Sequence, residues 1–475
     1  MTRRPVLASV LIGLAVVCSG CGPLNFSISR IAQSPDGKTL YLSLNADGGL
    51  EVDDSSCLYA LDVQSGRLKA LSGHAAPVGW CSVSGNGALL AYQEGHLLGM
   101  RVKSMDLATG EVTTLTPEDE IAGMPEFVPG DKDYVIALAA RSRKDLDKTS
   151  WVAYRGGKRF ELLPTEGEAS LFFSAAMAWD KALIKTVKVL DKGAEGRPPS
   201  VEYSLYVVGL SGDEPGIPVR VGEWKSTAAT LGCCAVISPD GERITAVLLT
   251  EEGGKPALLD IDPKNARPPR TLLKEAGILP LASTPDGKAV VGLCADLSKM
   301  ADFAGIGVWS EGDEKPRLLA SLPANVNFAL PLFTFPEPRR LRVVMTGNDG
   351  LRIVETNLDG TQGEGRMVSW RKLAIQRRLA DIEWSMAHGD AMLDRTRPPR
   401  AELLGPAQKG GKPVEKKPDP KEEAAAKERA AVDPEMAPIR ELKRAQDNVL
   451  STLLDAEWKK VEGWEKVPVF EQRAK

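Results

Sequence analysis

Ser34-Pro35-Asp36-Gly37-Lys38 is the most informative segment for the fold, because the chain repeats it. Two further copies read Ser238-Pro239-Asp240-Gly241-Glu242 and Thr284-Pro285-Asp286-Gly287-Lys288. Proline presets φ for the first turn position, aspartate tolerates the second, and glycine supplies the left-handed residue that closes a hairpin. We therefore assign a structural turn to each copy, with these residues at its tip: Asp36, Gly37, Asp240, Gly241, Asp286 and Gly287.

Weaker copies of the motif complete a regular series. Ser84-Gly85-Asn86-Gly87 and Val128-Pro129-Gly130-Asp131-Lys132 are degraded forms, and positions near 178 and 335 follow the same rhythm. Neighbouring copies are about 50 residues apart, a period typical of propeller blades. An alternating run of strand-forming residues follows the turns, as in Leu40-Tyr41-Leu42-Ser43-Leu44, and most repeats then contain a second hairpin. Each repeat is thus predicted to contain four strands.

These repeats predict an all-β fold, a seven-bladed β-propeller of four-stranded blades over residues 21–370. Six blades remain the alternative, because the unit around 171–222 is the least regular. A helical extension is expected after the last blade.

The repeated pattern also resembles a known family. Ser-Pro-Asp-Gly-Lys, a strand, and then Leu-Tyr-x-Leu-Asp-x-x-x-Gly is similar to the PD40 repeat of TolB-like and WD40-like β-propellers. The resemblance implies the fold but not a function, since such blades occur in scaffolds, peptidase gating domains and lyases. TolB carries an α/β domain before its blades, for which this chain has no room, so we do not expect its role in the Tol–Pal system here.

The N-terminus predicts export from the cytoplasm. Arg3 and Arg4 precede an apolar run over 6–17, which is too short to span a bilayer core of about 30 Å and is typical of a secretory signal. Ser19-Gly20-Cys21 resembles the bacterial lipobox, in which the cysteine is lipidated. We predict a signal peptide at 1–20 and lipid attachment at Cys21; a plain secretory signal and a retained membrane anchor are the alternatives.

Composition and charge exclude some partners. The 64 acidic residues outnumber the 60 basic ones, so the formal net charge is −4. A globally basic nucleic-acid binder is therefore excluded, and no nucleic-acid partner is expected.

Metal and cofactor sites have little support in the sequence. The chain has only three histidines, and the cysteines beyond Cys21 show no CxxC spacing, so neither a metal nor a cofactor is predicted. The histidines are His74, His96 and His388; the cysteines, whose disulfide pairing stays open, are Cys57, Cys81, Cys233, Cys234 and Cys294.

The sequence likewise offers no candidate catalytic residue. It contains no G-x-S-x-G nucleophile elbow and no glycine-rich phosphate loop. Acidic pairs such as Asp53-Asp54 and Glu251-Glu252 fall in turn-rich loops, where a solvated surface explains them. We expect a protein that is not an enzyme.

The chain changes character after the last blade. Residues 371–396 are predicted to form an amphipathic helix, and 397–435, rich in charge, a disordered linker. A second amphipathic helix and a tail are predicted over 436–475, and the helix could dock on the propeller or bind a partner. The apolar residues that define the first helix are Ile375, Leu379, Ile382, Met386 and Leu393.

Together these features predict a non-enzymatic, lipid-anchored β-propeller of the bacterial cell envelope, on the outer membrane or the periplasmic face. We expect it to act as a protein-binding scaffold, with the membrane contacted through its lipid. The alternatives are a propeller lyase or hydrolase acting on polysaccharide, and a purely structural envelope protein. Charged groups converging at the channel mouth would favour the enzyme, and an uncharged channel with an apolar patch on the rim would favour the scaffold.

Overall fold

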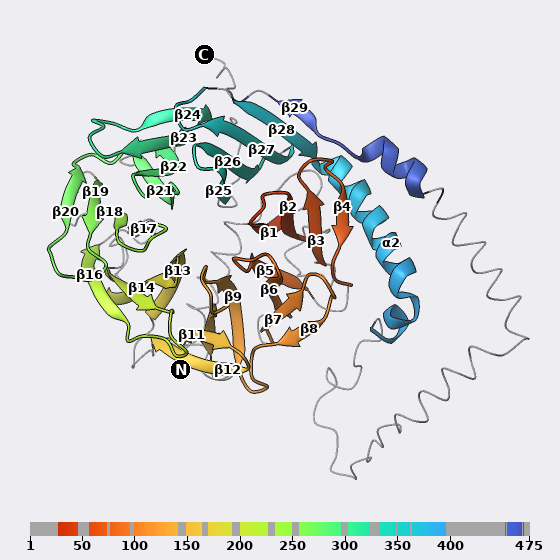
Figure 1. Ribbon diagram of the computed structural model, residues 1–475, viewed down its shortest axis with the longest axis horizontal. Helices are drawn as coiled ribbons and strands as arrows, with labels where there is room; N and C mark the ends of the chain where they lie inside the picture. Colours follow the sequence, from red (N-terminus) through yellow and green to blue (C-terminus); the bar gives the residue numbers. More distant parts are fainter. Residues whose placement is uncertain are drawn as a thin grey trace, which may run out of the picture.

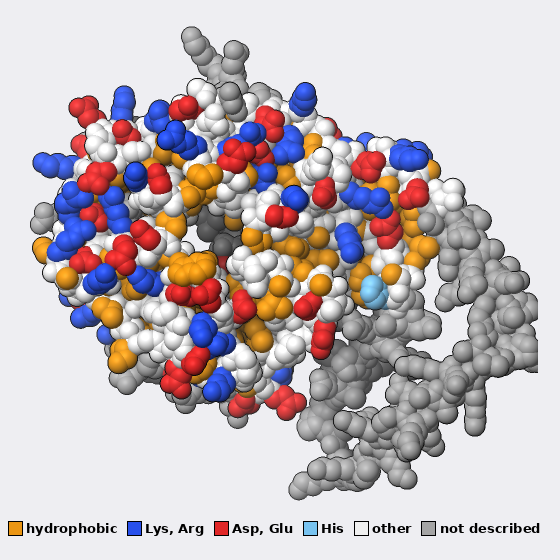
Figure 2. Space-filling view, viewed as in Figure 1, with side chains coloured by type: hydrophobic (Ala, Val, Ile, Leu, Met, Phe, Trp, Pro, Cys, Tyr) orange, Lys and Arg blue, Asp and Glu red, His pale blue; other side chains and the backbone are white. Residues whose placement is uncertain are grey.

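A computed structural model describes residues 27–45, 57–73, 77–95, 99–140, 149–163, 170–191, 200–226, 233–248, 256–295, 303–322, 332–347, 349–361, 363–395, 452, 454–467 and 469. Within these residues, seven antiparallel sheets are arranged in a ring (Figure 1), and the molecule is hollowed at the centre of this ring, here called the central channel (Figure 2). The predicted seven-bladed β-propeller is therefore confirmed, and the six-bladed alternative is wrong.

In each blade the first strand lies nearest the channel and the fourth lies on the outer rim (Figure 1). Blade 1 comprises β1 (Ser27–Gln33), β2 (Thr39–Asn45), β3 (Cys57–Asp62) and β4 (Leu68–Ala70). Blade 2 comprises β5 (Val78–Val83), β6 (Leu89–Glu94), β7 (Arg101–Asp106) and β8 (Val112–Thr114). Blade 3 comprises β9 (Ile121–Phe127), β10 (Val135–Ala140), β11 (Thr149–Arg155) and β12 (Lys158–Leu163).

The remaining blades follow the same order, and the last gains a fifth strand from the end of the chain. Blade 4 comprises β13 (Ser170–Ala178), β14 (Lys181–Asp191), β15 (Ser200–Gly209) and β16 (Val219–Ser226). Blade 5 comprises β17 (Cys233–Ile237), β18 (Ile244–Leu248), β19 (Ala257–Ile261) and β20 (Arg270–Leu273). Blade 6 comprises β21 (Ile278–Ser283), β22 (Ala289–Ala295), β23 (Phe303–Ser310) and β24 (Arg317–Ser321). Blade 7 comprises β25 (Leu332–Glu337), β26 (Arg340–Thr346), β27 (Gly350–Asn357) and β28 (Glu364–Ser369), to which β29 (Glu465–Val467) is added.

The inner hairpin of blade 1 shows how the repeated motif shapes a blade. The Gly37 N–H donates to the Ser34 carbonyl at 2.8 Å, and Gly37 adopts a φ of +70°, which glycine accepts without strain. Asp36 Oδ1 accepts the Ser34 hydroxyl at 2.6 Å and the Lys38 N–H at 3.1 Å. The serine hydroxyl, and then the backbone N–H, hold the pKa of Asp36 below its ordinary value. The aspartate thus closes the turn as a carboxylate.

The copies at 238–242 and 284–288 keep this turn, whereas the inner hairpin of blade 4 has a shorter connection of two residues. In the copies at 238–242 and 284–288, Gly241 and Gly287 have φ values of +69° and +68°. Blade 4 has no glycine at the corresponding point, and Asp180 adopts a φ of +52° instead. Aspartate is among the few residues that tolerate this conformation. The blade is therefore regular although its sequence motif has decayed.

An apolar core lies at every junction between neighbouring blades of the described chain. The four main strands of each blade are consecutive in the sequence, so no strand is exchanged between blade 7 and blade 1. The C-terminal segment lies across this last junction. Its α2 (Trp370–Arg395) runs along the outside of blade 1, and the helical residues 454–461 follow it back towards blade 7 (Figure 1).

The core at this junction combines both blades with the C-terminal segment. Leu454 and Trp458 of the second helix are 6% and 1% exposed, and both belong to the same core as Leu351 of blade 7 and Leu61 of blade 1. The Trp458 Nε1–H donates to Glu383 Oε1 at 2.7 Å. The second helix therefore docks on the propeller, one of the two outcomes that the sequence left open.

The buried face of α2 matches the predicted one only in part: Leu379 is 7% exposed and Met386 packs against the core between blades 7 and 1, as predicted. Ile375 and Ile382 are 38% and 41% exposed, whereas Gln376 is fully buried. The Gln376 side-chain amide donates to the Val461 carbonyl at 2.7 Å, and Arg377 Nε donates to the Tyr59 hydroxyl at 3.0 Å. The hydrogen bonds of the Gln376 amide nitrogen and the Arg377 guanidinium offset part of the cost of burying these side chains, and the two isoleucines are partly exposed to solvent.

Several predictions concern residues outside the described chain: the signal peptide at 1–20, Cys21, the linker at 397–435, His74 and His96. Among the described helices, none combines the length and the hydropathy that a membrane span requires.

Candidate functional site

The wall of the central channel offers few groups for proton transfer. The innermost strands β1, β5, β9, β13, β17, β21 and β25 contain, as charged residues, only Arg30, Glu126 and Glu337. Glu126 Oε1 accepts the indole N–H of Trp80 at 2.9 Å, a contact between neighbouring blades. General acid–base catalysis needs positioned titratable groups. The described part of the channel wall therefore has few side chains that could act as a general acid or base.

A large groove opens on the outer rim, where blade 1, blade 2 and α2 meet. Its volume is about 1300 Å³. One wall is the face of blade 2 with Met105 and Val112, and the opposite wall is α2 with Trp384 and Ala387; Leu71 of blade 1 also lines it. Figure 2 shows hydrophobic side chains over blade 1 and along α2 on this face of the molecule. The groove therefore has apolar walls that are open to solvent.

Specific contacts fix the α2 side of the groove. Gly73 lies so close to the ring of Trp384 that a Cβ there would be 2.7 Å from it. Trp384 stacks on His388, with ring centroids 4.2 Å apart, and the His388 Nδ1 lies 2.8 Å from the Trp384 carbonyl oxygen. Arg67 Nη2 donates to Glu383 Oε1 at 2.8 Å. The aromatic pair is thus held in place before anything binds.

Tyr59 of β3 fastens α2 to blade 1 beneath the groove. Its hydroxyl donates to Asp381 Oδ1 at 2.7 Å and accepts from Arg377 Nε. Burial, with the nearby Cys57 and Asp381, raises the pKa of Tyr59 well above its ordinary value. The hydroxyl therefore stays protonated and keeps its hydrogen bond to the carboxylate.

A second cavity continues the groove along blade 2. It measures about 610 Å³ and shares Glu94, Lys103 and Thr114 with the first cavity. The ammonium group of Lys103 is paired with Glu94, and Arg101 Nη2 donates to the Glu118 carbonyl at 2.7 Å. This end of the groove is polar and carries charges of both signs.

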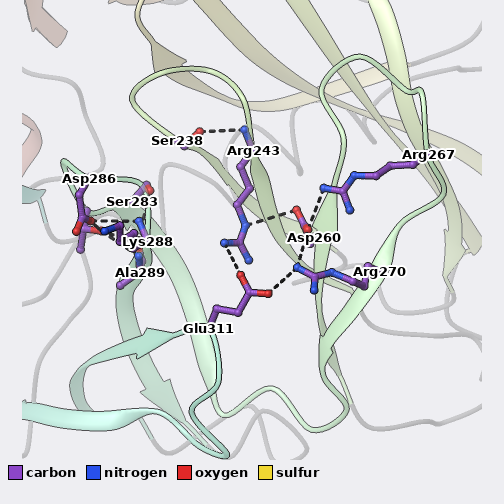
Figure 3. A network of polar contacts seen from close by, with 11 residues as sticks. Ser238, Arg243, Asp260, Arg267, Arg270, Ser283, Asp286, Lys288, Ala289 and Glu311 are labelled. Carbon is purple, nitrogen blue, oxygen red and sulfur yellow. Dashed lines mark hydrogen bonds and ion pairs between the residues drawn. The ribbon is translucent and has the colours of Figure 1, made fainter.

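A polar network joins blades 5 and 6 on their outer strands (Figure 3). The buried carboxylate of Asp260 lies between Arg243, Arg267 and Arg270, at distances of 3.4, 3.0 and 3.1 Å. Glu311 of blade 6 accepts from Arg270 at 2.7 Å and from Arg243 at 3.1 Å. The hydrogen bond from Arg270 is the main reason that the pKa of Glu311 lies below its ordinary value. Glu311, held ionised in this way, connects the two blades and is a poor proton donor.

A similar network joins blade 7 to blade 1. Arg342 Nε donates to Glu355 Oε1 at 2.7 Å, and Arg366 Nη2 donates to the same oxygen at 2.9 Å. Burial alone would raise the pKa of Glu355, but Arg342, Arg366 and Arg340 together hold it below its ordinary value. Arg342 also reaches Gln33 Oε1 at 3.2 Å and the Gly37 carbonyl in blade 1. This cluster thus spans the junction that closes the ring.

The residues singled out from the sequence do not converge on one site. Asp36, Asp240 and Asp286 lie in the inner turns of three different blades, whereas His388 lies on α2 at the rim groove. Within the described chain, no group of three or more His, Cys, Asp or Glu side chains is arranged to hold a metal ion.

The cysteines in the blades lie in apolar surroundings. Burial raises the pKa of the Cys234 thiol, and it raises that of Cys294 to about 11. Both are therefore protonated at neutral pH, and a thiol is a much weaker nucleophile than a thiolate. Cys57 and Cys81 are buried in the cores of blade 1 and of the junction between blades 1 and 2.

The sequence pattern did not indicate that Met105, Val112 and Trp384 line a common groove. Their segments are far apart in the chain, and nothing in the local pattern of β8 or α2 indicates that they meet. One signal was present: Trp384 follows Ile382 in the amphipathic stretch and lies off its predicted apolar face.

No family model and no curated protein matches the chain. Among solved structures, the chain is similar to an oligogalacturonate lyase in complex with manganese, at 12% identity over 69% of this chain and 91% of that chain, with a TM-score of 0.47. TolB from Acinetobacter baumannii shares 13% identity over 76% of this chain and 67% of its own, with a TM-score of 0.39. A puromycin-hydrolyzing peptidase of Mycobacterium tuberculosis shares 13% identity over 73% of this chain and 55% of its own, with a TM-score of 0.47.

Likenesses at these identities and scores concern the fold alone. The β-propeller fold predicted from the repeats is confirmed by the seven blades themselves. The activities of the similar proteins are not carried over to this chain.

Proposed function

We propose that this chain is a non-enzymatic, lipid-anchored β-propeller that binds a protein partner in the bacterial cell envelope. The observation that carries the proposal is the rim groove with its apolar walls. A groove of about 1300 Å³ exceeds the 300–1,000 Å³ usual for small-molecule sites. It combines an exposed valine and stacked aromatic rings with ion pairs both at one end (Lys103–Glu94) and on the α2 side (Arg67–Glu383), a mixture typical of a surface that takes up part of another protein.

The channel supports the same proposal. An enzyme acting on polysaccharide would need acids, bases or arginines at the place where substrate binds. The charged clusters around Asp260 and Glu355 lie instead on the second to fourth strands of their blades, where they join neighbouring blades. The described innermost strands carry only Arg30, Glu126 and Glu337 as charged residues.

Placing an aspartate in the groove should weaken partner binding by about tenfold or more. In Val112→Asp the new carboxylate would lose its hydration when the partner covers it, which costs more than the roughly 1.4 kcal/mol of a tenfold change. Val112 is 43% exposed in the free protein, so the blade should tolerate the change. Binding can be measured by co-purification of envelope proteins with the full chain and quantitative mass spectrometry.

The matched control is Val219→Asp, because Val219 is also 43% exposed on an outermost strand, but in blade 4. It should leave the partner bound. If both variants lost the partner to the same extent, or if neither lost it, the assignment of the groove as the binding site would be contradicted.

The lipid anchor predicts a second result. Cys21→Ala should release the protein from membranes into the soluble envelope fraction, because we propose that the lipid is its only membrane contact. Cys18→Ala, within the predicted signal peptide, should leave the protein attached. Fractionation of cells after a high-salt wash measures both, and retention of Cys21→Ala in the membrane would contradict the anchor. Gly22 lacks the acidic character that retains enteric lipoproteins in the inner membrane, so attached protein is expected in the outer membrane.

A further inference from the structure

The rim groove lies next to the outer edges of blades 7 and 1, which the C-terminal segment of this chain already covers. The outer edge of blade 7 is covered by β29, which pairs with β28 as a fifth antiparallel strand. The outer strand of blade 1 is covered by α2. The next outer strand around the ring is β8, and no described residue pairs with its outer edge. The face of α2 that carries Trp384 extends past blade 1 and becomes the wall of the groove beside β8.

The backbone of β8 is oriented to accept another strand. The Asp106 N–H donates to the Glu111 carbonyl, and the Leu115 N–H donates to the Val102 carbonyl. In an antiparallel pair the bonding residues alternate, so Glu111, Thr113 and Leu115 bond towards β7. The N–H and C=O groups of Val112 and Thr114 consequently point away from the blade.

The side chains of the same two residues line the groove. Val112 and Thr114 lie on one face of β8, since side chains two residues apart share a face, and both border the cavity. A strand added at this edge would therefore gain main-chain hydrogen bonds from β8 and could place alternate side chains between Met105 and Trp384.

We propose that the groove takes up an extended segment of the protein partner, which pairs with β8 and becomes a fifth strand of blade 2. The segment carries apolar side chains at every second position, for the apolar part of the groove near Trp384. After these positions, the partner segment carries charged or polar residues, which face the end of the groove that contains the Lys103–Glu94 pair. This inference rests on the proposed function and specifies the form of the partner.

The experiment uses the full chain and peptides of about ten residues, selected on it from a displayed library, since strands are usually five to six residues long. Thr114→Pro removes the outward N–H and leaves the bonds between β7 and β8 intact, a position at which edge strands tolerate proline. The control Thr114→Val keeps the N–H and the shape of the side chain. Selected peptides should bind Thr114→Pro about tenfold more weakly and Thr114→Val as well as the parent, because one main-chain bond and its partner are lost.

Hydrogen exchange provides the second readout. Bound peptide should slow exchange at the amides of Val112 and Thr114 in the parent protein, and thermal melting should show that Thr114→Pro stays folded. Equal affinity for Thr114→Pro and the parent would overturn the proposal. Slow exchange at these two amides before any peptide is added would also overturn it, because β8 would then already be paired with another segment of this chain or with a second copy.

The two proposals fail in different ways. Loss of the partner in Val112→Asp together with normal binding to Thr114→Pro would leave the groove as the binding site but exclude the added strand. A helix or a folded surface would then occupy the groove. Normal partner binding to Val112→Asp would instead contradict the proposed site itself.

Discussion

Replacing Trp458 by alanine is expected to lower the free energy of unfolding by about 4 kcal/mol, within the range for truncating a buried tryptophan. The side chain is 1% exposed in the core shared by blade 1, blade 7 and α2, and Arg67 lies over its ring at 4.6 Å. The substitution also removes the indole donor from Glu383. Because blades 7 and 1 exchange no strand, this core and its flanking contacts close the ring, and its loss should open that junction first.

Urea denaturation measures the change, and hydrogen exchange locates it. The exchange of amides in β4 and β28 should rise more than that in blades 3 to 5. Trp179→Ala is the control, since Trp179 is 54% exposed, and it should change stability by less than about 0.5 kcal/mol. If both tryptophan variants were equally stable, the C-terminal segment would have no part in closing the ring.

Arg342→Leu should lower the free energy of unfolding by about 3 kcal/mol, the lower end of the range for breaking a buried ion pair. Arg342 is 7% exposed, and its loss would leave the buried Glu355 with Arg340 and Arg366 only. It would also remove the hydrogen bonds to Gln33 and Gly37 across the junction.

Two further variants test the reason for this effect. Arg339→Ala changes an exposed arginine of the same hairpin and should be nearly neutral. Adding Glu355→Leu to Arg342→Leu removes the partly compensated charge, so the double variant should be more stable than the sum of the two single changes. Simple additivity in this double-mutant cycle would show that the two side chains do not act as a pair.

The architecture of the ring was predictable because its signals are local. The turn of blade 1 is formed by hydrogen bonds among residues 34–39, so one short sequence motif contains the groups that close it. Blade 4 shows the limit of this reasoning. There a two-residue connection replaces the motif, and Asp180 adopts the left-handed conformation that glycine adopts in the repeated motif.

The groove and the closing junction were not predictable in the same way. Gln376 and Arg377 look like solvent-facing residues of an amphipathic helix, but their partners are the Val461 carbonyl and the Tyr59 hydroxyl. Those partners come from the far end of the chain and from blade 1, so helical periodicity alone placed Ile375 and Ile382 on the wrong face. The pairing of β29 with β28 depends in the same way on the path of the chain after α2.

Photocrosslinking in intact cells tests most directly the central claim that the rim groove binds a protein partner. A benzophenone amino acid replaces Val112 in one variant and Val219 in the other, at equally exposed positions on outer strands. We expect a crosslinked partner from position 112 and none from position 219, with the crosslinked peptide mapped to one segment of that partner. Crosslinks of equal yield from both positions, or none from position 112 while the protein is correctly localised and folded, would contradict it.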